Sequence, residues 1–84
     1  MVRIKWVRPL DGFRVSLGFT DGTSGEVDLA PYLRGPVFEP LVADPALFRA
    51  VHVDPELRTI VWPNGADMDP DVLYGLTRSA GVGS

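Results

Sequence analysis

A seven-residue stretch with strict apolar and polar alternation constrains this fold most. In FRVSLGF, apolar residues occupy every second position: Phe13, Val15, Leu17 and Phe19. Successive side chains of a β-strand point to opposite faces, so a period of two predicts a strand with one buried face. An Asp-Gly pair, typical of hairpin turns, stands on each side of it. The stretch is therefore expected to be the middle strand of an antiparallel meander.

The two turns predict the strand register. A two-residue turn at the first Asp-Gly pair places Trp6 opposite Leu17 and Ile4 opposite Phe19. It leaves only Arg8, opposite Val15, on the wrong face. At the second pair, a loop one residue longer or a bulge places Leu17 opposite Val27. The expected strands cover residues 2–9, 13–20 and 24–29.

Short helices and a second hairpin are expected after the meander. DLAPYL and GPVFEPL are too interrupted by proline for more than one helical turn each. In ADPALFRAV, Asp44 is the expected N-cap and Pro45 the first helical residue. The β-branched residues on both sides of DPEL predict a hairpin of residues 50–53 with 58–62.

The segment MDPDVLYGL predicts the last helix. Asp69 is a natural N-cap, Pro70 suits the first helical position, and Asp71 lies where the helix dipole favours negative charge. The apolar stripe expected to dock on the sheet consists of Val72, Leu73 and Leu76.

Length and composition allow one small domain. A chain of 84 residues with 45% hydrophobic and 23% charged residues is typical of a globular protein with a modest core. We expect one α+β domain over residues 1–78, built from an antiparallel three-stranded meander, a second hairpin, short helices and a C-terminal helix packed on the sheet. Residues 79–84 are expected to form a flexible tail.

Composition also narrows the classes of function. The absence of cysteine excludes disulfides and thiolate metal sites, and no apolar run suggests a signal peptide or membrane span, so we expect a cytoplasmic protein. A net charge of −3 argues against nucleic-acid binding by the chain alone and favours a basic partner. Arg3, Lys5, Arg8 and Arg14 are interpreted as a solvated strand face, with an anion-binding strip as the alternative.

Three alternating aspartates form the densest candidate for metal chemistry. Asp67, Asp69 and Asp71 match the first, third and fifth positions of a calcium-binding EF-hand loop. The match then fails, because Val72 replaces the required glycine and Arg78 the required glutamate. A small metal-dependent hydrolase using these carboxylates stays the least favoured alternative.

Other catalytic and cofactor motifs are missing from the sequence. His52 is the single histidine and stands between two valines, so it is interpreted as structural or exposed. TDGTSG lacks the lysine of a phosphate-binding loop. We therefore expect no enzyme activity, no catalytic residue, no metal and no cofactor.

The segment WPNGAD contains three side chains without a sufficient local explanation. Trp62 is large enough to anchor either the core or an interface. Asn64 and Asp67 suit hydrogen bonds to the local backbone or to a partner. Trp62, Asn64 and Asp67 are therefore the candidates for partner binding.

The motifs VFEPL, DPALF and, above all, TIVWPNGADMDPDVLY resemble the bacterial domain-of-unknown-function family numbered 2442, over residues 3 to 76. The resemblance implies a small α+β domain without an established enzyme activity. Members resemble companions of another small uncharacterised family in neighbouring genes, which suggests a toxin–antitoxin-like or regulatory pair. Some members carry a helix-turn-helix extension that residues 1–84 lack.

The most favoured function is a non-enzymatic protein-interaction module, as the acidic antitoxin-like partner of a small basic protein encoded by an adjacent gene. The alternative is an accessory component of a transcriptional regulator. Self-association into a homo-oligomer is a further alternative, because an exposed sheet edge can pair with a strand of another copy.

Overall fold

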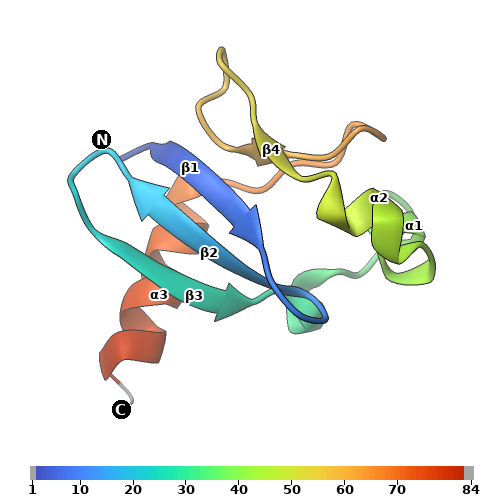
Figure 1. Ribbon diagram of the computed structural model, residues 1–84, viewed down its shortest axis with the longest axis horizontal. Helices are drawn as coiled ribbons and strands as arrows, with labels where there is room; N and C mark the ends of the chain where they lie inside the picture. The colour runs from blue at the N-terminus through green and yellow to red at the C-terminus, as the bar shows by residue number, and fades with distance from the viewer. Residues whose placement is uncertain (1, 83–84) are drawn as a thin grey trace.

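The computed structural model describes residues 2–82, with side chains described through residue 77. It has the predicted α+β architecture: a three-stranded antiparallel sheet, a two-stranded hairpin, short helices and a C-terminal helix (Figure 1). The strands are β1 (Ile4–Pro9), β2 (Arg14–Phe19), β3 (Ser24–Asp28), β4 (His52–Val53) and β5 (Ile60–Val61). The helices are the 3₁₀ turn η1 (Ala30–Tyr32), α1 (Glu39–Ala43), α2 (Pro45–Arg49) and α3 (Pro70–Val82).

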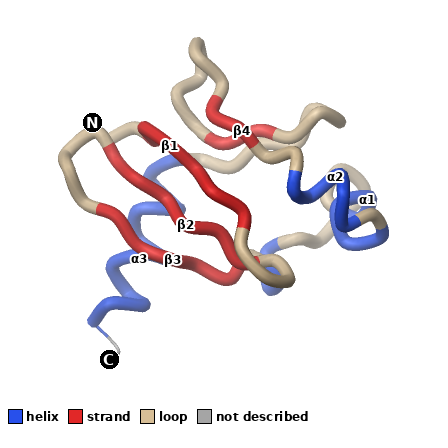
Figure 2. Tube along the Cα trace, viewed as in Figure 1, coloured by secondary structure: helices blue, strands red, loops and turns tan. Residues whose placement is uncertain are grey.

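The sheet order is β1-β2-β3, and its two faces have different surroundings. Helix α3 crosses one face and packs against β3, the hairpin β4–β5 lies beside β1, and α1 and α2 lie at the far end (Figures 1 and 2). The face opposite α3 has no helix over it (Figure 2). No helix within residues 2–82 is long and apolar enough to cross a membrane.

The first hairpin is one residue out of the predicted register. Leu10 donates its N–H to the carbonyl of Arg14 at 2.8 Å, so the loop has three residues instead of two. The predicted pairing of Trp6 with Leu17 is therefore wrong. The shift also removes the misfit at Arg8, which now lies on the exposed side of the sheet.

A bulge between Ile4 and Trp6 places these two side chains on opposite faces of the sheet, although residues two apart in a regular strand share a face. Ile4 keeps the predicted pairing with Phe19 and is buried. Trp6 instead lies opposite Gly18 on the other face, where 39% of its surface is exposed. A Cβ atom at Gly18 would collide with the indole of Trp6, so the missing side chain makes room for the ring.

The register predicted for the second hairpin of the meander is also wrong. Leu17 lies opposite Gly25 instead of Val27, and Val27 pairs with Val15. A Cβ atom at Gly25 would collide with Cγ2 of Thr77 in α3. Matching apolar residues across the strands therefore misled the prediction, because the position opposite Leu17 is left empty for the helix.

Asp21 closes the loop between β2 and β3 and also joins it to α3. Its carboxylate accepts hydrogen bonds from the backbone N–H of Thr23 at 3.0 Å, from the Thr23 hydroxyl at 2.7 Å and from the Tyr74 hydroxyl at 2.7 Å. These bonds, the Thr23 hydroxyl foremost, lower the pKa of Asp21 from 3.8 to about 2.

The lowered pKa of Asp21 predicts an acid-dependent loss of stability. A carboxyl whose folded pKa is depressed stabilises the fold above its unfolded pKa and loses that contribution as the pH falls through the folded value. We expect the melting temperature advantage of the wild type over Asp21→Asn to be full well above pH 3.8, to shrink between pH 3.8 and about 2, and to vanish below pH 2. Thermal unfolding followed by circular dichroism at several pH values measures it, and an advantage that is constant with pH would contradict the assignment.

The core lies between the sheet, α3, the hairpin β4–β5 and the short helices. Phe48 connects two aromatic neighbours, with ring centroids 5.2 Å from Phe13 in an edge-on contact and 5.9 Å from Trp62. Phe38 also contacts Trp62 edge-on at 6.3 Å. Fully buried side chains around this group are Ile4, Val15, Leu17, Leu29, Leu41, Ile60 and Leu73.

The predicted helix starts are confirmed. The carboxylate of Asp44 accepts a hydrogen bond from the N–H of Ala46 at 3.1 Å, and α2 begins at Pro45. At α3, Asp69 accepts the N–H of Asp71 at 2.8 Å. Both aspartates thus satisfy backbone donors that the first helical turn leaves free.

The docking face of α3 was predicted only in part. Leu73 is buried and Leu76 half-buried, but Val72 is 52% exposed, so its predicted place in the apolar stripe is wrong. The helix is turned so that Thr77 fits against Gly25. Helix α3 continues to Val82 and residues 83–84 lie outside the described part, so a flexible tail at 79–84 stays a prediction.

Candidate functional site

Trp62 lies in the core, which is one of the two roles expected for it. Only 2% of its surface is exposed, and the indole Nε1–H donates to the carbonyl of Phe48 at 3.0 Å. The bond satisfies the one polar group that burial of the ring takes from water. A direct contact of this side chain with a partner would require the core to open.

Asn64 connects two segments that are distant in sequence. Its Nδ2 donates to the carbonyl of Val37 at 2.8 Å, and its Oδ1 accepts from the N–H of Ala66 at 3.2 Å. Gly65, with φ of +92°, completes the loop, because that backbone angle is costly for residues with a side chain. Asn64 therefore fixes the turn after β5 against the segment that precedes α1.

Asn64→Ala should destabilise the fold by about 1 kcal/mol, because it removes two hydrogen bonds at an exposed position. Asn64→Asp is the matched variant: it keeps an acceptor for Ala66 but places a carboxylate against the carbonyl of Val37. Chemical denaturation measures both. Full stability of Asn64→Asp would show that the bond to Val37 contributes nothing.

Asp67 differs from the other two candidates because its exposed side chain makes no hydrogen bond or ion pair with the residues that the structure describes. Its backbone forms a bridge with Val61, on the side of β5 that faces away from β4. This bridge fixes the position of the Asp67 side chain. Asp67 is therefore a carboxylate held in place by its backbone while its charged group stays available.

A shallow groove of about 300 Å³ contains Asp67 and the start of α3. We call it the acidic groove; its lining residues are Leu57, Thr59, Asp67, Met68, Asp69 and Pro70. The Thr59 hydroxyl is buried and donates to the carbonyl of Met68, so it belongs to the wall. Leu57 is 50% exposed although it is apolar. The groove thus combines apolar surface with two carboxylates.

The three alternating aspartates have separate surroundings. Asp69 caps α3, Asp71 lies in its first turn, and Asp67 lies in the acidic groove. Within the described residues, no group of three or more histidine, cysteine, aspartate or glutamate side chains is placed to hold a metal ion. His52 is exposed, and its Nδ1 lies 3.1 Å from the carbonyl of Ala50.

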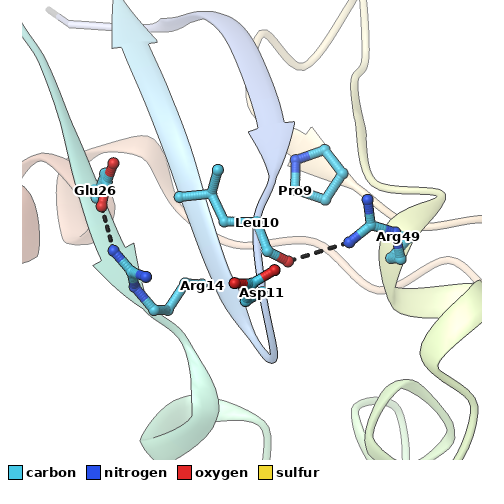
Figure 3. A pocket seen from close by; sticks show the side chains of 6 residues that line it. All are labelled: Pro9, Leu10, Asp11, Arg14, Glu26 and Arg49. Atoms are coloured by element: carbon cyan, nitrogen blue, oxygen red, sulfur yellow. Dashed lines mark hydrogen bonds and ion pairs between the residues drawn. The ribbon is translucent and has the colours of Figure 1, made fainter.

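A second hollow, of about 310 Å³, lies beside the loop of the first hairpin (Figure 3). Arg14 and Arg49 enter it from opposite sides (Figure 3). Arg14 forms an ion pair with Glu26, and Arg49 donates to the carbonyl of Leu10 at 3.1 Å. Both cations therefore serve contacts within the chain, and the second of them ties α2 to the hairpin.

The sequence reasoning missed the apolar part of the acidic groove. Leu57 belongs to the turn DPEL and Met68 to the connection before α3, and neither segment has a hydrophobic period. The one signal available in the sequence was the presence of a large apolar residue, Leu57, within a turn. Of the residues that line the groove, Asp67 alone was predicted to bind a partner, because no cap or turn explained it.

The fold and the groove together define a small α+β domain with an acidic, partly apolar surface depression. The chain belongs to the family of proteins of unknown function DUF2442, whose model matches residues 4–79. This match confirms the family that the motifs around WPNGAD suggested. No curated protein matches the sequence significantly.

A solved structure shares the fold: the putative DNA-binding protein NE0471 of Nitrosomonas europaea. The two are 25% identical, with a TM-score of 0.82 over 96% of this chain. The chain spans about half, 52%, of the length of that protein. The similarity confirms the architecture of the domain.

Proposed function

We propose that this chain is a cytoplasmic, non-enzymatic protein-interaction module that acts as the acidic member of a pair with a small basic protein. The acidic groove carries the proposal, because it presents the free carboxylate of Asp67 beside the exposed apolar surface of Leu57. The overall charge of −3 has the same sign and assists the approach of a cationic protein.

The groove suits a lysine or arginine side chain of the partner. Such side chains bury their aliphatic stems along apolar surface while the charged end stays in a polar environment. Leu57, Met68 and Pro70 offer the apolar surface, and Asp67 offers a charge-assisted hydrogen bond. One oxygen of Asp69 already accepts the N–H of Asp71, so Asp67 carries most of this role.

Co-expression with the product of the adjacent gene tests the proposal. We expect the two proteins to co-purify and to elute together in size-exclusion chromatography, and the complex to weaken at high salt because exposed charges contribute to it. Separate elution at low salt, with no rescue of growth when the partner is toxic alone, would contradict the proposal.

A second candidate is an accessory domain of a transcriptional regulator. The observation in its favour is the similarity to half of NE0471, a putative DNA-binding protein. A gel shift with the promoter of the chain's own gene, with and without the adjacent gene product, separates the two candidates. A shift that needs both proteins favours the regulator, whereas complex formation without any shift favours the interaction module alone.

A further inference from the structure

Strand β3 forms an open edge of the sheet. The hydrogen bonds of Phe19 with Thr23 and of Leu29 with Phe13 set the alternation along the β2–β3 ladder. From this alternation, the backbone N–H and C=O groups of three exposed residues point away from β2: Ser24, Glu26 and Asp28. Within residues 2–82 no strand pairs with this side of β3 (Figure 2).

The opposite edge of the sheet is protected in ways that β3 is not. In β1 a bulge follows Ile4, the N–H of Ile4 is bonded to the carbonyl of Arg58, and Pro9 has no N–H to offer. Strand β3 has no proline and no bulge along its length. One edge is therefore closed to a further strand, and the other has the regular geometry that strand addition requires.

Charge selects among the strands that could pair with this edge. Glu26 and Asp28 are exposed, and the ion pair that Glu26 forms with Arg14 is itself exposed and easily exchanged. A second copy of β3 would place Glu26 beside Glu26 in either direction of a centred pairing, and like charges on neighbouring strands repel. An added strand with cationic residues on this face would meet opposite charge instead.

We propose that the free edge of β3 binds an extended segment of the basic partner by β-strand addition, with lysine or arginine alternating with small apolar residues. The cations lie on the face of Glu26 and Asp28, and the apolar residues on the face of Val27. This inference rests on the proposed function and gives the partner a second point of attachment besides the acidic groove.

Amide hydrogen exchange with a short synthetic peptide of alternating lysine and valine tests the inference. The outward amides of Ser24, Glu26 and Asp28 exchange quickly in the free chain, and we expect the peptide to slow them about tenfold or more. A peptide with glutamate in place of lysine should leave them unchanged. The adjacent gene product is not used, so the result does not depend on whether the proposed complex forms.

Two variants separate backbone pairing from charge. Ser24→Pro removes one outward N–H at the first residue of an edge strand, where proline is tolerated, and should weaken binding about tenfold. Glu26→Lys should weaken binding similarly at low salt and less at high salt. Glu56→Lys changes the net charge equally at an exposed residue in the turn between β4 and β5, on the β1 side of the sheet, and should bind as the wild type does.

Three results would overturn the inference: protection of amides outside β3 without protection of those in β3, equal protection by the glutamate peptide, or no protection at saturating peptide. Protection that rises with protein concentration in the absence of peptide would also overturn it and would assign the edge to a second copy of the chain. Circular dichroism of each variant establishes that the fold is intact before the comparison is made.

Discussion

Trp62→Ala should remove most of the stability of this domain, with an expected loss of about 3–5 kcal/mol. The ring is 2% exposed and contacts Phe48 and Phe38, so truncation leaves a cavity and an unpaired carbonyl lone pair at Phe48. Small domains are stable by only about 5–15 kcal/mol, so the variant should be partly unfolded at moderate temperature. Urea denaturation followed by far-ultraviolet circular dichroism measures the loss.

Trp6→Ala is the matched control for this prediction. Trp6 is 39% exposed and covers Gly18 on the outer face, so its removal should cost about 1 kcal/mol. Equal losses from the two tryptophans would contradict the placement of Trp62 in the core. Circular dichroism is needed because each variant alters the tryptophan fluorescence.

Leu17→Ala should destabilise the fold by about 2–5 kcal/mol, the second largest expected effect. Leu17 is fully buried in the central strand, where Gly25 faces it and cannot fill the space that the truncation opens. Thermal and urea unfolding measure the loss.

Ser16→Ala gives the control on the adjacent position of β2. Its side chain alternates with the buried side chains of Val15 and Leu17 and so lies on the opposite face of the sheet, and the change should stay within about 0.5 kcal/mol. A large loss at Ser16 with a small loss at Leu17 would mean that the strand presents its opposite face to the core.

The strand positions and helix starts could be predicted because each depends on local chemistry. The alternation of FRVSLGF sets its buried face, and Asp44 and Asp69 each precede a proline that begins a helix. Those features need no knowledge of distant segments, and the structure confirms them.

The predicted pairings of Trp6 and Val27 with Leu17 were wrong because they depend on partners that the local pattern does not contain. Gly25 faces Leu17 so that Thr77 of α3 can approach, and Gly18 faces Trp6 so that the indole has room. A rule that pairs apolar residues across strands disfavours glycine at both positions. Gly25 is nevertheless required by the helix packed on the sheet, and Gly18 by the ring that lies over it.

The candidate site was predicted in part for the same reason. Trp62 and Asn64 were recognised as unexplained, and their distant partners Phe48 and Val37 give each a structural role. Among the side chains that the structure describes, Asp67 has no such partner, and its exposed carboxylate lies in the acidic groove. Partner binding by these residues stays a prediction, and it now concentrates on Asp67.

The affinity of the Asp67→Lys variant for the basic partner tests the central claim most directly. The exposed side chain can be reversed in charge without loss of a hydrogen bond, so the fold should be intact. Isothermal titration should show binding about tenfold to a hundredfold weaker than the wild type, with Asp11→Lys unchanged as the control of equal net charge. Equal affinities for the wild type and both variants would contradict a partner site at the acidic groove.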